Sequence, residues 1–376
     1  MRVLIFARDP GGANAVVPLV RSLVDRGHGV RLAGKDAALR IYRRHSLEAI
    51  DIASLSPALT PQSIRQFLIQ GSPSVVITGT SADDSTEKII WSECCNLRIP
   101  SMAIVDQWLN YGIRFSPFGV NEMSEYLQQP DLCHLPDIIV APDEYAREEM
   151  IREGLPKERI RAWGQPYFET VMQQGQATGP EKTDSSGTEY SDAFTVLFAS
   201  EPISTTYGSE QALRHWGYTE KTILSSLIDA LERVAPESPR TITLLIRPHP
   251  KEGSEHFQDL IQRCRRIRCD IDRSVSQWSA MRAADLVCGM SSMFLIESVL
   301  LGRQVISIQT GLTRENPFIL DRRGILRSVL CDTDLYERLR RSIVEGAAET
   351  ASFGIIPHAA ERIITEMEKL PCRNWP

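Results

Sequence analysis

The sequence predicts an α/β protein with two doubly wound domains, each built around a parallel sheet. Short apolar runs alternate with amphipathic stretches of helical spacing, the pattern of successive strand–helix–strand units. The strand candidates are apolar at nearly every position, as in sheets that helices cover on both faces. A polar stretch at 173–193 interrupts this alternation, which then restarts. A chain of 376 residues is also long enough for two domains.

The first half begins with a strand, a glycine-rich turn, a helix and a second strand within residues 2–34. This is the size of one βαβ unit, and its right-handed crossover makes the two strands parallel. Further strands are expected at 74–81, 99–108 and 136–143, and helices at 36–45, 61–71, 84–96 and 144–154. We therefore expect an N-terminal Rossmann-like domain over residues 1–172.

The second half repeats the alternation after the interruption. Residues 173–193 are rich in Gly, Ser, Thr and charge, and predict a flexible linker or surface loop. Strands are expected at 194–200, 241–250, 285–292 and 304–311, and helices at 219–235, 254–264, 277–284 and 293–302. We expect a second Rossmann-like domain over 194–350, and a C-terminal helix within 351–376 that closes back on the first domain.

Composition excludes several classes of protein. The 42 Lys+Arg against 48 Asp+Glu give a net charge of -6, which disfavours a nucleic-acid partner. No apolar run approaches the roughly 20 residues of a membrane helix, and the first residues lack the features of a signal peptide. The eight cysteines contain no CxxC pair and indicate reduced thiols in a cytoplasmic protein. The arginine run at 263–268 is interpreted as a solvated helix end, with peripheral contact at the inner face of a membrane as the alternative.

Ligands of open α/β sheets bind where strands end and loops lead into helices. After the first strand comes a turn containing Asp9, Gly11, Gly12 and Asn14. The two glycines would let the backbone approach a ligand, and the following helix N-terminus favours an anion. The turn is neither GxGxxG nor a Walker loop. The alternative is a tight turn in which Asp9 caps the helix.

Two further turns of the first half carry polar side chains. Thr80 and Ser81 follow a buried strand, and their hydroxyls would hold a sugar or phosphate, or only cap the next helix. Asp106 ends another strand beside Trp108 and is a candidate base for a sugar hydroxyl. Arg114 would bind a carboxylate or phosphate, or simply lie in a solvated loop.

The second half contains two distinctive strand ends. Arg247 and His249 follow a very apolar strand, and prolines flank the histidine on both sides. Such an imidazole is held in one place and suits hydrogen bonding to a phosphate or leaving-group oxygen.

The other distinctive strand end carries a glycine and two serines. Gly289, Ser291 and Ser292 join a strand to an apolar helix, where hydroxyls and free helix amides favour an anion. Glu297 on that helix would reach a ribose diol. The alternative is a double-serine cap with an exposed glutamate.

Together these segments resemble GT-B fold glycosyltransferases. The similarity rests on the His-Pro strand end, the strand–Gly–Ser-Ser–helix–Glu segment, the following GRQVIS strand, and residues 141–169 with their GLPKERI and GQP segments. The related families are bacterial surface-polysaccharide transferases with HP and SS motifs, CDP-glycerol glycerophosphotransferases and non-hydrolysing UDP-N-acetylglucosamine epimerases. The resemblance implies two Rossmann-like domains that face a central cleft, and a nucleotide-sugar donor on the second domain.

Carried onto this chain, the resemblance assigns His249, Ser291 and Ser292 to the donor phosphate and Glu297 to the ribose. The acidic base motif of the sialyltransferases is missing, so Asp9 and Asp106 are base candidates from their positions. Donor binding is also expected of Gly11, Gly12, Arg247 and Gly289, and acceptor binding of Asn14, Thr80, Ser81, Trp108 and Arg114.

We therefore expect a glycosyltransferase that moves a sugar from a nucleotide-activated donor, of unknown nucleotide, to a glycan or lipid-linked acceptor in surface-polysaccharide or glycoconjugate synthesis. No DxD pair lies in a suitable loop, so metal independence is expected, with no cofactor besides the co-substrate. The alternatives are an epimerase, a CDP-polyol phosphotransferase and a non-catalytic nucleotide-sugar-binding protein. A NAD-linked oxidoreductase is disfavoured because GxGxxG is missing.

Overall fold

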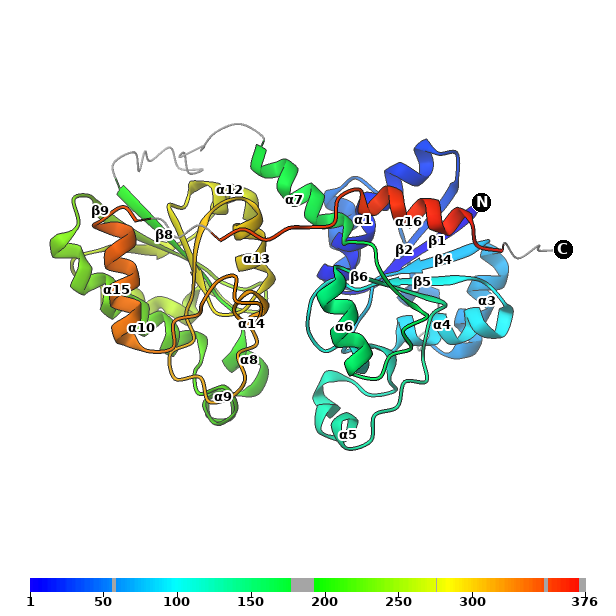
Figure 1. Cartoon of the computed structure of the whole chain (residues 1–376), viewed down its shortest axis with the longest axis horizontal. Coiled ribbons are helices and arrows are strands. Elements are labelled where there is room, and N and C mark those ends of the chain that lie inside the picture. The colour runs from blue at the N-terminus through cyan, green and yellow to red at the C-terminus, as the bar shows by residue number, and fades with distance from the viewer. Residues whose placement is uncertain (56–58, 177–192, 275, 348–350, 372–376) are drawn as a thin grey trace. The chain divides into compact units, whose positions relative to one another are not determined.

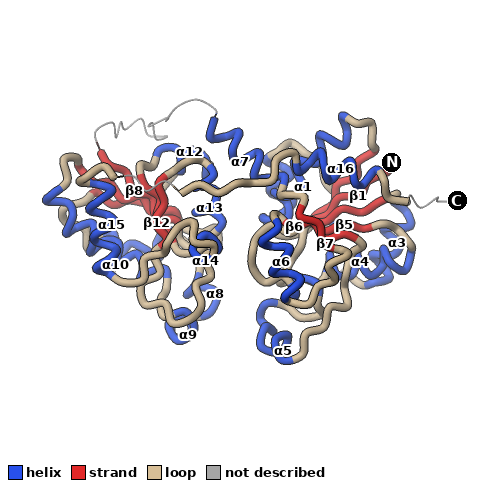
Figure 2. Tube along the Cα trace, in the orientation of Figure 1, coloured by secondary structure: helices blue, strands red, loops and turns tan. Residues whose placement is uncertain are grey.

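The computed structural model describes residues 1–55, 59–176, 193–274, 276–347 and 351–371. The chain divides into two compact units, Met1–Thr170 with Gly354–Pro376, and Val171–Phe353. Each contains one parallel sheet with helices on both faces (Figures 1 and 2). The prediction of two doubly wound α/β halves is therefore confirmed.

In the described part of the first unit, the sheet has seven strands in the order β3-β2-β1-β4-β5-β6-β7. The strands are β1 (Arg2–Ala7), β2 (Gly29–Gly34), β3 (Ile50–Asp51), β4 (Val75–Thr78), β5 (Ser101–Ile104), β6 (Ile138–Ala141) and β7 (Ile160–Ala162). The helices are α1 (Pro10–Asp25), α2 (Ala37–Arg44), α3 (Pro61–Gly71), α4 (Thr86–Leu97), α5 (Met123–Gln128), α6 (Glu144–Arg152) and α16 (Ala359–Glu368). The boundary between the two units falls within α7 (Pro166–Gln176). Short 3-10 turns lie at η1 (Ile52–Leu55), η2 (Gly112–Phe115) and η3 (Val120–Glu122).

The described part of the second unit has five strands in the order β10-β9-β8-β11-β12. They are β8 (Ala193–Ala199), β9 (Thr241–Arg247), β10 (Arg268–Ile271), β11 (Leu286–Gly289) and β12 (Gln304–Ser307). The helices are α8 (Ile203–Tyr207), α9 (Ser209–Trp216), α10 (Glu220–Val234), α11 (Gln258–Ile261), α12 (Gln277–Ala283), α13 (Met293–Leu300), α14 (Ile319–Arg322) and α15 (Asp332–Ile343), with 3-10 turns η4 (Ala235–Glu237) and η5 (Ser254–Phe257).

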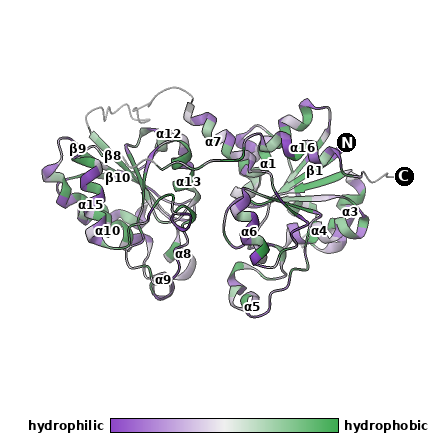
Figure 3. Ribbon diagram, viewed as in Figure 1, coloured by the Kyte–Doolittle hydropathy of each residue, from purple (hydrophilic) through white to green (hydrophobic). Residues whose placement is uncertain are grey.

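Strand β1 shows why the first sheet needs helices on both faces. Its side chains alternate between two separate cores. Val3 and Ile5 belong to the core that contains residues of α1 and α16, while Leu4 and Phe6 belong to the core built with α3 and α4. Figure 3 accordingly colours β1 as hydrophobic. Both faces of this strand are buried and apolar. Polar side chains that could bind a ligand are therefore expected in the turn that follows the strand.

Two segments differ from the sequence expectations in their bounds. Residues 173–176 are the last turn of α7 and Ala193 already belongs to β8, whereas the rest of the expected linker, 177–192, lies outside the described residues. The glycine turn after β1 is also helical, because α1 begins at Pro10. Proline suits the first position of a helix, where its missing N–H has no intrahelical partner.

The C-terminal α16 packs in the first unit. Its Ile363, Ile364 and Met367 are buried in the same core as Val16 and Leu19 of α1. None of the described helices combines the length and apolar character that a membrane crossing requires.

Candidate functional site

The carboxyl edge of the second sheet carries the predicted donor-binding groups. In the strand order, β8 lies between β9 and β11, and successive connections leave it in opposite directions, which is where open α/β sheets bind ligands. His249 follows β9, and Ser291 and Ser292 follow β11. The imidazole and the serines therefore lie on one edge, with the end of β8 between them.

The end of β8 supplies a carboxylate that the sequence analysis did not select. Glu201 accepts hydrogen bonds from the backbone amides of Ser291 at 2.5 Å and Ser292 at 2.8 Å, and from the Ser291 hydroxyl at 3.0 Å. These amides open helix α13, where the helix dipole and free N–H groups favour negative charge. The chain's own carboxylate therefore accepts from the amides to which the sequence assigned a donor phosphate, and phosphate binding there stays a prediction.

The pKa of Glu201 is raised overall, because burial outweighs the hydrogen bonds to its carboxylate. Burial raises the pKa of Glu201, while the hydrogen bonds from Ser291 and Ser292 lower it. The Ser292 hydroxyl is buried without a hydrogen-bond partner among the described residues, although Ser292 is the N-cap residue of α13. A buried hydroxyl without a partner among the described residues therefore lies at the start of α13.

His249 is held as a neutral hydrogen-bond donor. Burial, and then the charge of Lys251, lower its pKa to about 4, so the imidazole is uncharged near neutral pH. The amide of Lys251 donates to Nδ1 at 3.2 Å, which makes Nδ1 the acceptor and leaves the proton on Nε2. Nε2 is therefore the ring nitrogen that can donate a hydrogen bond.

A second carboxylate holds the histidine loop to β8. Glu252 accepts from the His249 amide at 2.7 Å and from the Ser200 hydroxyl at 3.0 Å. Its neighbours Glu220 and His256 are hydrogen-bonded to each other at 2.7 Å. One ligand atom from each of Glu220, Glu252 and His256 lies within 4.8 Å of the others, so these three residues have the spacing of metal ligands. Hydrogen bonds already occupy them.

The remaining predicted donor-binding residues are tied to neighbours. Arg247 is ion-paired with Asp272, whose side chain is buried, so its charge is balanced within the protein. Glu297 is also buried and accepts from the Gln277 amide at 2.8 Å, unlike the exposed glutamate of the simple capping alternative. Gly289 ends β11 with no room for a side chain, since a Cβ there would lie 3.0 Å from the Ala199 carbonyl.

In the first unit, three predicted residues form one buried cluster. Arg114 donates to Asp106 at 2.9 Å and to the Thr80 hydroxyl at 2.7 Å, and its Nε donates to the Asn110 carbonyl at 3.1 Å. All three predicted residues are less than 9% exposed. Burial raises the pKa of Asp106, and the Arg114 charge opposes that shift. The cluster fastens the loops after β4 and β5 together.

The glycines after β1 are required by close packing. A Cβ at Gly11 would lie 1.7 Å from Oδ2 of Asp106, and one at Gly79 would lie 2.6 Å from Cα of Gly12. The first turn of α1 is therefore pressed against Asp106 and the end of β4. Protein atoms fill the space where side chains at Gly11 and Gly12 would lie, and donor binding at these glycines stays a prediction.

Of the other candidates in the first unit, Asp9 and Asn14 are partly exposed, and Ser81 and Trp108 are buried. Asp9 is partly exposed and paired with Arg8 at 2.9 Å, without capping α1 through its side chain, and Asn14 is half-buried in α1. Ser81 is buried, where its hydroxyl accepts from the Asp83 amide at 3.2 Å. Trp108 is buried and stacked on Phe168, with ring centroids 5.3 Å apart.

These positions place most of the side chains expected to bind an acceptor in the interior of the first unit. Four of these side chains are buried and already contact a neighbouring loop or ring: Thr80, Ser81, Trp108 and Arg114. Their contact with an acceptor stays a prediction. The predicted catalytic residues and the predicted donor-binding residues are both divided between the units, with Asp9, Gly11, Gly12 and Asp106 in the first and His249 with the serines in the second.

Glu87 is a further carboxyl group that the sequence analysis missed. It lies in the first turn of α4 and is buried, and neither oxygen has a partner among the other described residues. Burial, and then the charges of Asp9 and Asp84, raise its pKa to about 8. Its sequence signal is weak, because a glutamate at a helix start usually lies in solvent.

Comparison with known proteins shows the fold. No family description matches the sequence, and no curated protein matches it. The UDP-GlcNAc 2-epimerase of Neisseria meningitidis bound to UDP-GlcNAc is 15% identical, with 98% of this chain and 100% of that chain covered and a TM-score of 0.66.

Two other solved structures are similar over the same length. The S. aureus MnaA–UDP structure is 14% identical, with 98% and 96% covered and a TM-score of 0.63. MurG of Acinetobacter baumannii is 10% identical, with 98% and 99% covered and a TM-score of 0.57. The GT-B fold expected from the motifs is therefore confirmed over nearly the whole chain.

Proposed function

We propose that this protein is an enzyme acting on a nucleotide sugar, and that it transfers the sugar to a glycan or lipid-linked acceptor. The observation that carries the proposal is the carboxyl edge of the second sheet. There the amides of Ser291 and Ser292 already hold an anion, the Glu201 carboxylate, and a neutral His249 lies on the same edge.

The donor phosphates would replace Glu201 at the start of α13. Phosphate oxygens accept from the same amides, and the buried Ser292 hydroxyl adds a donor. His249 would donate from Nε2 to the oxygen that leaves the anomeric carbon, stabilising the charge that develops there. Glu297, already buried on α13, would accept from ribose hydroxyls.

The base that activates the acceptor would come from the first unit. Asp9 is the more accessible candidate, since its side chain is 29% exposed, whereas Asp106 is buried and paired with Arg114. The acceptor would bind near Asn14 on the same edge. The proposal involves no cofactor or metal besides the co-substrate, no nucleic acid, and a cytoplasmic location that includes contact with a membrane surface.

Epimerisation of the nucleotide sugar is the second candidate. It is favoured by the similarity over 98% of the chain to proteins named UDP-GlcNAc 2-epimerases, one of them bound to UDP-GlcNAc. The similarity to the MurG glycosyltransferase covers the same share of the chain and supports sugar transfer. Both reactions place a sugar diphosphate on the second unit, so the two candidates share one binding site.

The experiment begins with calorimetry of UDP, CMP, CDP, GDP and ADP, followed by incubation of the full chain with the matching nucleotide sugars. Nucleotide release that needs an acceptor supports transfer, and an epimerised sugar nucleotide without acceptor supports epimerisation.

His249→Ala should lower turnover at least about 100-fold, while His45→Ala, an exposed histidine, should not. A chain that binds none of the nucleotides contradicts the proposal.

A further inference from the structure

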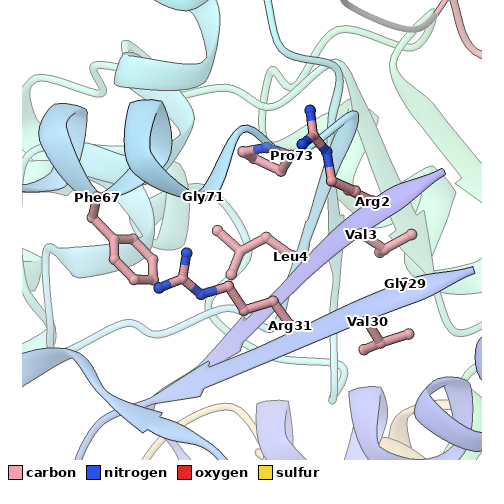
Figure 4. A pocket seen from close by; sticks show the side chains of 9 residues that line it. All are labelled: Arg2, Val3, Leu4, Gly29, Val30, Arg31, Phe67, Gly71 and Pro73. Carbon is pink, nitrogen blue, oxygen red and sulfur yellow. The ribbon is translucent and has the colours of Figure 1, made fainter. Parts of the chain in front are cut away.

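A pocket of about 220 Å³ lies at the end of the first sheet opposite to the strand ends described above. The amino-terminal parts of β1 and β2 form its floor, and the end of α3 forms a wall (Figure 4). Every residue around it belongs to the first unit. The pocket is therefore separate from the candidate site, and binding of a ligand in it is independent of the proposed function.

The strand register explains why there is a hollow. Arg2 is paired with Gly29, and Leu4 with Arg31, so these four residues point to the same face of the sheet. Three of them have long side chains, and the fourth has none. A Cβ at Gly29 would meet only the Met1 carbonyl, at 3.9 Å. The missing side chain at Gly29 thus leaves open space on this face of the sheet, beside Arg2.

Arg31 is held in place by its surroundings. Its guanidinium carbon lies 4.8 Å from the centre of the Phe67 ring, a stacking arrangement that guanidinium groups favour. On the other side it lies against the end of α3, where a Cβ at Gly71 would be 2.7 Å from its Nη1. Figure 4 shows Leu4 between this guanidinium and that of Arg2. The cation is therefore positioned before any ligand arrives.

Neither cation is neutralised. Within the described parts of the chain, no carboxylate or other acceptor pairs with the side chain of Arg2 or Arg31, whereas Arg8 and Arg26 both have carboxylate partners. Two like charges at diagonal positions on neighbouring strands repel each other. A bound anion removes that repulsion and accepts hydrogen bonds from both guanidinium forks.

We propose that this pocket binds an organic phosphate with an apolar body. A phosphate monoester carries nearly two negative charges at neutral pH, which matches the two guanidinium groups. Its phosphate would lie between the guanidinium groups of Arg2 and Arg31. Its body would pack on Leu4 and against the ring of Phe67.

The test is a titration of the full chain with phenyl phosphate, followed by NMR of backbone amides and by calorimetry. We expect shifts at the amides of residues 29–31 and saturable binding. Arg2→Ala and Arg31→Ala should each weaken binding at least about tenfold. Gly29→Val, which fills the hollow and keeps both charges, should abolish it. Arg44→Ala, an exposed arginine of α2, is the matched control and should bind like the original chain.

Two comparison ligands test the two halves of the proposed chemistry. Inorganic phosphate should bind at least about tenfold more weakly than phenyl phosphate if the apolar body is buried, and phenol should not bind. Equal affinity for inorganic and phenyl phosphate would overturn the apolar part. Unchanged binding in Gly29→Val, with circular dichroism showing a folded chain, or no shift at residues 29–31, would overturn the site itself.

Discussion

At the scale of single residues, we expect Glu201 to control how tightly the second unit binds an anion. Its carboxylate occupies the amides of Ser291 and Ser292, so an incoming diphosphate competes with it and is repelled by it. Replacing the charge should relieve both effects. We expect Glu201→Gln to bind the nucleoside diphosphate about 3–10-fold more tightly, a gain of about 1 kcal/mol.

Calorimetry at neutral pH measures this change. Glu210→Gln, an exposed glutamate of α9 paired with Arg214, is the control and should leave the affinity unchanged. If Glu201→Gln binds nucleotide more weakly while remaining folded, Glu201 is a direct ligand or support of the site and not a competitor.

Glu87 makes the stability of the first unit depend on pH. Burial raises its pKa to about 8, so the folded state holds a proton that the unfolded chain releases near pH 4.5. The stabilising contribution is complete below that value and is lost as pH rises through about 8. Arg8, Asp9 and Asp84 surround this group.

Glutamine cannot ionise. We therefore expect the difference in stability between Glu87→Gln and the original chain to change with pH. As pH rises from 5 to 8, the free energy of unfolding of this variant should increase by at least about 1 kcal/mol relative to that of the original chain. Urea denaturation at several pH values measures this. Glu93→Gln on the same helix is the control, since it is paired with Arg65. Parallel pH profiles for the original chain and Glu87→Gln would contradict the prediction.

Local sequence reasoning found the residue types but not all of their partners. The serine pair at 291–292 was identifiable because two hydroxyls follow an apolar strand and precede a helix. Glu201 was not, since its contact joins residues 90 positions apart and nothing local marks it. Asp106 and Arg114 were selected separately, and only the fold shows that they form a pair.

At the scale of elements, the packing of α1 against the end of β4 sets the identity of two glycines. A Cβ at Gly79 would lie 2.6 Å from a backbone carbon of Gly12, and neither element can move without disturbing the core. We expect Gly79→Ala to cost about 1–3 kcal/mol, the usual cost of overpacking. Gly354→Ala, which has no atom within 4 Å of its Cβ, should be neutral in the same urea measurement. Equal stability of the two variants would show that the contact relaxes freely.

The elements themselves were predictable because they are strongly patterned. Continuous apolar runs predicted the main strands, and right-handed crossovers predicted that the first two of them are parallel. The start of α1 was misplaced because Pro10, Gly11 and Gly12 are typical turn residues, whereas tertiary packing makes them the first turn of a helix.

At the scale of the whole molecule, the chain builds two compact units and returns at its end to the first. Helix α16 buries Ile363, Ile364 and Met367 in the core that contains Leu19 of α1. Glu368 adds contacts to Arg26 at 3.2 Å and His28 at 2.8 Å. The last helix is therefore part of the first unit's stability although more than 300 residues separate it from α1.

This arrangement predicts where a C-terminal substitution acts. Ile364→Ala should lower the free energy of unfolding by about 2–4 kcal/mol, the cost of a cavity in a packed core. Hydrogen exchange should show faster opening of α1 and β1, while β8 and α10 of the second unit keep their protection. Ile69→Ala, an isoleucine of α3 that is 45% exposed, is the control and should change little. Equal loss of protection in both units would mean that their cores unfold as one.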